Sequence, residues 1–89
     1  MLPLNYAILK MFEKEQEPLC VQDVMNRLND DYKGFRAFKE PYVTEALMSG
    51  EKNGLLDEVR IELGEDKKLA VYYLANDTGR AVIKKYIKG

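Results

Sequence analysis

The side chains that most often perform catalysis are scarce in this sequence. Histidine, the commonest general base and metal ligand, is absent from all 89 residues. The one cysteine, Cys20, therefore has no histidine with which to form a nucleophilic pair. Neighbouring carboxylates occur at Asp30-Asp31, Asp57-Glu58 and Glu65-Asp66, in segments whose polarity indicates exposed turns or solvated strands. Because acid/base pairs need a pocket that separates their pKa values, we predict that the chain is not an enzyme and binds no metal or cofactor.

Cys20 is compatible with two roles. It stands just before a helical pattern, at the position that Ser or Thr usually fills, and Asp23 stands at the acidic position of a capping box. A thiol at a helix N-terminus can have a lowered pKa and act as a redox sensor. Most lone cysteines, in contrast, are small buried side chains. A single cysteine cannot form an internal disulfide, which agrees with a reducing compartment.

Basic and aromatic side chains alternate in residues 32–42. They are Lys33, Arg36 and Lys39, interleaved with Tyr32, Phe35, Phe38 and Tyr42. Such a pattern can serve stacking on bases and contact with phosphates. Alternatively, the two phenylalanines fill the edge of the core while the three bases stay in water. The chain holds 14 basic and 15 acidic side chains, so any basic surface must be a local one.

The apolar pattern of residues 41–53 predicts a helix, and the rest of the chain is organised around it. Val43, Leu47 and Gly50 recur on one helix face. Gly54 suits the left-handed position just past the end of a helix. Because Gly50 stands where a large apolar residue is typical, we expect another element to approach the helix closely there.

A hairpin is predicted after this helix. Val59, Ile61 and Leu63 alternate with polar residues, which is typical of a strand with one wet face. Residues 64–68 are polar and turn-like. Residues 69–74 are apolar on both faces, so we expect this second strand to be covered on both sides. Two such runs joined by about five residues indicate a β-hairpin.

Three further helices are expected on either side of this centre. The first covers residues 5–16 and ends before Pro18, because the residue before proline avoids the helical region. The second covers about 21–29, which leaves a separation of roughly ten residues before the helix at 41, against three or four in a usual helix-turn-helix. The last begins at Asn76 or Asp77 and runs to about Lys88.

The first and last helices carry more apolar residues than one small core needs. Tyr6, Leu9 and the face from Ile83 to Ile87 widen their stripes. We therefore expect a homodimer through helix one and helix four, although a helix well wrapped by its own domain fits the pattern equally well. Residues 1–89 are expected to form a single domain. No apolar run approaches the ~20 residues that span a membrane and no signal peptide is evident, so we expect a cytoplasmic protein.

The order of these elements resembles the second half of a winged helix-turn-helix domain. The residues that carry the resemblance are Glu51-Lys52-Asn53-Gly54-Leu55-Leu56 and Tyr72-Tyr73-Leu74-Ala75-Asn76-Asp77-Thr78-Gly79. The pattern is most similar to PadR-like and MarR-like bacterial regulators, whose usual Leu-Thr is Leu74-Ala75 here. The resemblance implies an α+β winged-helix fold with a three-helix core, a two-stranded β-hairpin wing and a C-terminal helix.

The resemblance also implies a DNA-binding transcriptional regulator. Helix 41–53 would enter the major groove of duplex DNA, and the wing, residues 59–74, would lie at the backbone. The candidate base-edge residues are Tyr42, Thr44, Glu45 and Ser49, and the candidate phosphate contacts are Lys33, Arg36, Lys39, Lys67 and Lys68. Glu45 stands where similar regulators often carry a base; a carboxylate can accept from cytosine but repels phosphate.

A winged-helix module that binds protein and not DNA is the alternative function. The near balance of charge, a pI of about 5.5 and the expected exposure of Tyr42 and Met48 favour it. In that case a protein partner would bind the face that carries Tyr42 and Met48.

Overall fold

The computed structural model describes residues 1–88; Gly89, the last residue of the predicted domain, lies outside the described residues. Its elements are α1 (Leu4–Met11), α2 (Val21–Tyr32), α3 (Glu40–Lys52), β1 (Leu56–Leu63), β2 (Leu69–Ala75) and α4 (Asp77–Tyr86). β1 and β2 form a two-stranded antiparallel sheet. The predicted α+β class, with three helices, a hairpin and a closing helix, is confirmed.

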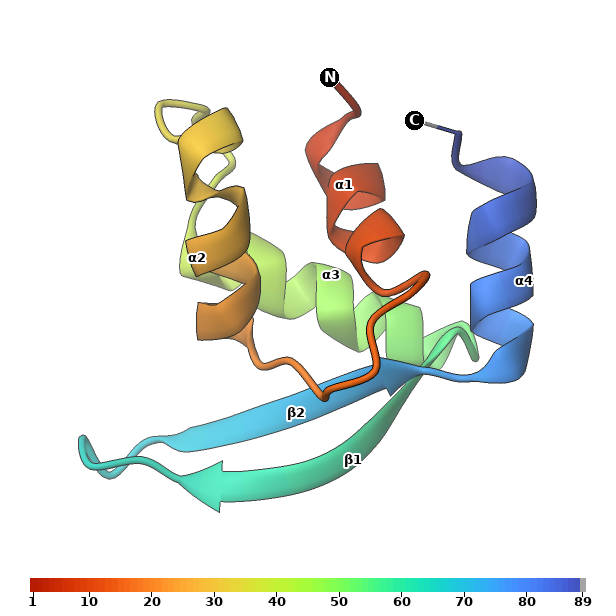
Figure 1. Cartoon of the computed structure of the whole chain (residues 1–89). Coiled ribbons are helices and arrows are strands. Elements are labelled where there is room, and N and C mark those ends of the chain that lie inside the picture. The colour runs from red at the N-terminus through yellow and green to blue at the C-terminus, as the bar shows by residue number, and fades with distance from the viewer. Residues whose placement is uncertain (89) are drawn as a thin grey trace.

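The helices gather on one side of the molecule and the hairpin projects beyond them. α1, α2 and α3 form the three-helix core, and α4 stands on the far side of α1 from α2 (Figure 1). The hairpin, called the wing below, runs under these helices, and its tip lies beyond α2 (Figure 1). α3 contacts α1, α2 and β1, so the central helix of the sequence is also central in space.

One apolar core joins all the elements. Its large fully buried side chains are Phe12, Ile8, Leu47, Leu56, Ile83, Val24 and Val43. Burying each such side chain contributes roughly 1.5–3 kcal/mol. Ile83 and Ile87 are 0% and 7% exposed and belong to this core, so the expectation that they widen an outer face of α4 was wrong.

The predicted close approach at Gly50 is present. A Cβ at this position would lie 2.8 Å from Leu56 Cδ1 and 3.4 Å from Leu9 Cδ2. Just past the end of α3, Gly54 adopts the predicted left-handed conformation with a φ of 80°. The helix itself begins and ends within one residue of the predicted bounds.

The first two helices differ from the prediction in length. α1 ends at Met11, five residues before the expected Gln16. The carbonyl groups that follow bond to Arg80 of α4 and not to a further helical turn. α2 continues three residues past Asn29 to Tyr32, because Tyr32 is buried and its hydroxyl donates to the carbonyl oxygen of Leu2. The separation between α2 and α3 is therefore shorter than predicted.

The wing is less covered than the sequence indicated. Ile61 pairs with Val71 and Leu63 with Leu69, so these four side chains share one face. Leu63 is nevertheless 68% and Leu69 70% exposed. The expectation of a second strand covered on both sides was wrong, because Tyr73 and Ala75 are buried on one face only near the end of β2, while Ala70, Tyr72 and Leu74 on the other face are half-buried. A register shift between Glu58 and Arg60 marks a bulge in β1, which bends the strand.

Candidate nucleic-acid interface

The four candidate base-edge residues all lie on α3 but do not form one face. Thr44 is half-buried and lines a hollow of about 400 Å³ that also touches Leu69 and Val71 of β2. Tyr42 and Ser49 lie on the opposite flank and line a second hollow beside α1. Glu45 is exposed between the two flanks. The structure therefore separates Thr44, on the wing side, from Tyr42 and Ser49, on the α1 side.

The candidate phosphate contacts fall into separate groups. Lys33 and Arg36 are exposed in the loop beyond the C-terminal end of α2, which Figure 1 shows well away from the tip of the wing. The opposite end of α2, at Cys20, borders the hollow that Lys68 lines. A helix of 12 residues is roughly 18 Å long. The loop bases and the wing bases therefore cannot contact the same phosphate.

The tip of the wing holds Lys67 and Lys68 in a defined turn. The amide of Gly64 donates to the carbonyl oxygen of Lys68 and the amide of Lys67 donates to that of Gly64, both at 2.9 Å. Asp66 Oδ1 accepts from the amide of Lys68 at 3.0 Å. Lys67 adopts a left-handed φ of 63°, which is uncommon for a residue other than glycine. Both lysines are exposed.

The charge around α3 and the wing is predominantly negative. Residues 40–75 contain eight Asp and Glu but only four Lys and Arg. Of those four bases, Arg60 pairs with Glu62 at 2.6 Å and lies 4.2 Å from the ring centroid of Tyr72. Lys39, at the N-cap of α3, and the loop bases Lys33 and Arg36 lie outside this acidic stretch. Attraction to phosphate must therefore come from the edges of the surface and not from its centre.

The aromatic residues of the segment 32–42 pack together more than they project. The rings of Tyr32 and Phe35 meet edge to face with centroids 5.1 Å apart, and Phe38 is half-buried against the core. Phe35 remains 48% exposed. Phe38 therefore fills the edge of the core, as one of the two interpretations of this segment expected, while Phe35 and the three bases remain accessible.

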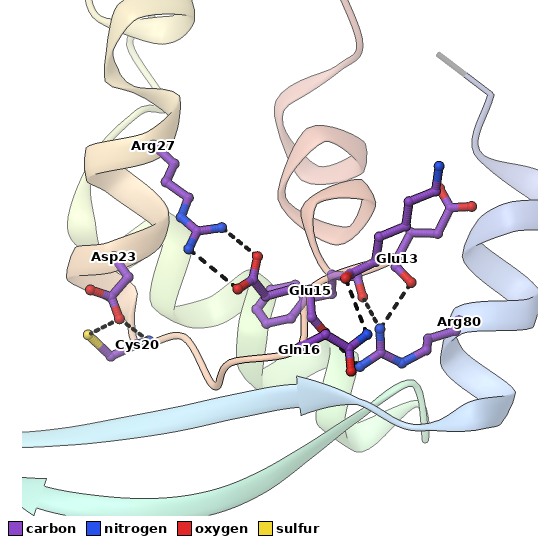
Figure 2. A network of polar contacts seen from close by, with 9 residues as sticks. Glu13, Glu15, Gln16, Cys20, Asp23, Arg27 and Arg80 are labelled. Carbon is purple, nitrogen blue, oxygen red and sulfur yellow. Dashed lines mark hydrogen bonds and ion pairs between the residues drawn. The ribbon is translucent and has the colours of Figure 1, made fainter.

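Cys20 forms the predicted capping box. Its amide donates to Asp23 Oδ2 at 3.1 Å and its thiol lies 3.4 Å from the same oxygen (Figure 2). The residue is 7% exposed. This burial agrees with the role of a small buried side chain and not with that of a redox sensor.

A polar network that the sequence did not reveal fixes the segment between α1 and α2. The Arg80 guanidinium donates to the carbonyl oxygens of Phe12, Glu13 and Glu15, at 3.3, 3.0 and 2.7 Å (Figure 2). The Arg27 guanidinium of α2 donates two hydrogen bonds to the carboxylate oxygens of Glu15, at 2.6 and 3.4 Å. The only sequence signal for this network was a basic residue one turn into α4. In the sequence, that residue cannot be told apart from a solvent-exposed arginine. The network joins α4 and α2 through this segment.

The two carboxylates of this network have lowered pKa values. The hydrogen bond from Arg27 is the main cause for Glu15, and the hydrogen bond from Lys10 is the main cause for Glu13. Lys10 Nζ and Glu13 Oε1 form an ion pair with a distance of 2.7 Å. These groups face neighbours within the fold, so they stabilise the structure and are not placed to act on a ligand.

Within residues 1–88 there is no cluster of three or more His, Cys, Asp or Glu side chains that could hold a metal ion. No helix in the same range is both long and apolar enough to cross a membrane. The features that remain as a candidate site are thus α3, the wing and the bases at their edges.

The geometry of α3 and the wing is shared with solved regulators. Bacillus subtilis PadR in complex with operator DNA aligns with a TM-score of 0.73 at 20% identity, over 97% of this chain and 49% of that one. The protein has the winged-helix fold. A PadR-like transcriptional regulator from Bacillus cereus aligns with a TM-score of 0.65 at 20% identity, over 92% of this chain and 75% of the other.

A PadR-like transcription factor from Bacteroides fragilis aligns with a TM-score of 0.70 at 17% identity, over 92% of this chain and 74% of the other. The resemblance to PadR-like regulators is thus confirmed in the fold. This winged-helix chain spans about half the length of the Bacillus subtilis PadR chain. No protein-family model and no curated protein matches the sequence.

Proposed function

We propose that this winged-helix protein is a DNA-binding transcriptional regulator. The observation that supports the proposal is the likeness of nearly the whole chain to a regulator whose structure holds operator DNA. In this proposal α3 enters the major groove and the wing lies along the backbone. Residues 1–89 act as one domain, without catalytic activity, in the cytoplasm.

The proposed contacts differ in what they contribute. Thr44, Glu45, Tyr42 and Ser49 would read base edges, Glu45 by accepting from cytosine. Lys33, Arg36 and Lys39 would hold the backbone on one side of α3, and Lys67 and Lys68 on the other. Because the centre of the surface is acidic, the binding energy depends on these five bases more than in a basic winged helix.

We also propose that the protein acts as a homodimer through α1 and α4. Tyr6 of α1 and Tyr86 of α4 are 46% and 69% exposed and would carry the contact, while Leu9 is half-buried beside α3 and not free for it. A two-fold dimer would present two α3 helices to half-sites about 34–36 Å apart. Sedimentation should give a species of twice the 10.3 kDa chain mass. A monomer alone at high micromolar concentration would contradict this, and Tyr86→Ser would be expected to weaken the dimer.

Fluorescence anisotropy with mixed genomic duplex fragments tests the proposed function. The protein should bind at low salt and lose affinity steeply as salt rises, because each neutralised phosphate contributes roughly 0.9 to the slope of log K against log salt. An absence of binding at tens of micromolar protein, near 50 mM salt, would remove the regulator function. A protein partner on the Tyr42 and Met48 face would then be sought by pull-down.

A further inference from the structure

A hollow lies between α1 and α3, on the flank of α3 that faces away from the wing. Its volume is about 360 Å³, which is within the usual range of small-molecule sites. Leu9 of α1 and Leu55, just after α3, form apolar walls, and Asn5, Tyr42, Glu45 and Asn53 supply the polar and aromatic lining. We propose that this α1–α3 hollow binds a small organic cation that carries an aromatic ring.

Small residues on α3 create the space. Ala46 and Gly50 line the hollow one turn apart, and neither carries a side chain larger than a methyl group. Gly50 is closely packed, because side-chain atoms of Leu56 and Leu9 lie within 3.4 Å of where its Cβ would be. Ala46 is only half-buried and Ser49 is exposed. A larger side chain at Ala46 would narrow the hollow.

The positive charge of the ligand is inferred from Glu45. This carboxylate lines the hollow and takes part in none of the ion pairs or side-chain hydrogen bonds among residues 1–88. Asn5 and Asn53, which also line the hollow, are neutral amides. An ammonium group placed here would form a charge-assisted hydrogen bond with Glu45, which is stronger than a neutral one.

The aromatic ring of the ligand is inferred from the walls and from Tyr42. Leu9 and Leu55 offer apolar surface from two different elements. Tyr42, which is 38% exposed, lines the same hollow as Glu45 and stands three residues before it on α3. A ring between Leu9 and Leu55 with an ammonium beside Tyr42 and Glu45 would combine apolar burial with a cation–π contact.

The experiment uses 2-phenylethylammonium as the probe and 2-phenylethanol as its neutral counterpart of equal shape. Chemical-shift titration of the isotope-labelled full chain should show saturable binding of the ammonium compound with a Kd below about 1 mM. The shifted amides should belong to Asn5, Leu9 and α3. The neutral alcohol should bind at least several-fold more weakly.

The matched variants are Glu45→Gln and Glu51→Gln. Both remove one exposed carboxylate from α3, but only Glu45 lines the hollow. Glu45→Gln should weaken the ammonium compound roughly tenfold, the loss expected for a charge-assisted bond, while Glu51→Gln should change its Kd by less than twofold. Either an absence of saturable binding or equal effects of the two variants would overturn the proposal.

Competition between the cation and DNA is expected if the proposed DNA-binding function holds. Tyr42, Glu45 and Ser49 line the hollow and are also candidate base-edge residues, so the bound cation and DNA should exclude one another. If the probe binds as described but does not displace DNA, the assignment of these side chains to the DNA interface fails and the ligand site stands. If the probe does not bind, the ligand site fails whatever the protein does with DNA.

Discussion

Gly79 of α4 lies directly against the backbone of Leu55. A Cβ at Gly79 would lie 2.7 Å from the carbonyl carbon of Leu55 and closer still to its oxygen. The same carbonyl accepts from the amide of Asn76, whose side-chain amide donates to the carbonyl oxygen of Gly54 at 2.9 Å. Asn76 Oδ1 in turn accepts from the Gly79 amide at 2.7 Å and caps α4. Hydrogen bonds and close packing therefore join the start of α4 to the turn that ends α3.

Gly79→Ala should destabilise the fold strongly. The new methyl group meets rigid backbone, so α4 must move, at a cost of about 3 kcal/mol or more, the upper end for overpacking. Gly50→Ala is the control, because its methyl group meets the end of the flexible Leu56 side chain. Urea denaturation followed by circular dichroism compares the two. Equal losses of unfolding free energy would show that α4 is not held rigidly against Leu55.

Arg80→Met should loosen the segment between α1 and α2. The substitution keeps most of the side-chain length but leaves the carbonyls of Phe12, Glu13 and Glu15 without their donor, which should lower the unfolding free energy by about 1.5–3 kcal/mol. Arg60→Met removes an exposed ion pair on the wing and should change it by less than about 1 kcal/mol. Hydrogen exchange should accelerate at residues 13–17 only in the Arg80 variant; protection that stays at the wild-type level would contradict the role of Arg80.

The Glu15–Arg27 pair should make stability depend on acid pH. The pKa of Glu15 is lowered in the folded protein from 4.5, chiefly by the hydrogen bond from Arg27. A lowered folded pKa means that the pair stabilises fully above the unfolded pKa and ceases to do so as pH falls through the folded pKa. The stability difference between wild type and Glu15→Gln should therefore be largest near pH 7 and shrink below about pH 4.5. Thermal melts of the two proteins taken from pH 7 to pH 3 measure this difference, and a difference that stays constant over that range would contradict the role of the pair.

Replacing the two wing lysines should weaken DNA binding without changing sequence preference. Lys67 adopts a left-handed backbone conformation, which asparagine accepts more readily than alanine. The double variant Lys67→Asn with Lys68→Gln should therefore retain the turn better than two alanines would. The slope of log K against log salt should fall by roughly 0.9 for each phosphate that the variant no longer neutralises. Thr44→Val should instead alter the preference among sequences, since base contacts specify and phosphate contacts position. A lysine variant whose salt slope matches that of the wild type would place the wing away from DNA.

Local signals in the sequence were sufficient for α3 and for the junctions around it. Val43, Leu47 and Gly50 indicated the buried face, and Gly54 indicated the helix end, because these features depend on periodicity and backbone freedom within a few residues. The conclusion that α3 is the organising helix follows from the same residues.

Contacts between distant residues set the features that were missed. The carbonyls that follow the early end of α1 bond to Arg80, which is 65 to 68 residues further along the chain. α2 extends to Tyr32 because its hydroxyl reaches Leu2. In the candidate site, helical periodicity separates the flanks of α3 but does not reveal that Thr44 faces the wing and Tyr42 faces α1. Neither local propensity nor hydrophobic spacing contains such information.

The wing is anchored to the rest of the fold at its base, and its outer part is exposed. Near its base, Leu56 is buried and Tyr73 exchanges two backbone hydrogen bonds of 2.9 Å with Leu19. From Ile61 to Leu69 every residue is exposed, and the bulge between Glu58 and Arg60 lies just inboard of that span. A small change of angle at the bulge would move Lys67 and Lys68 through a much larger arc. In the proposed complex with DNA, such a change would fit the wing charges to grooves of different width while the helices stay still.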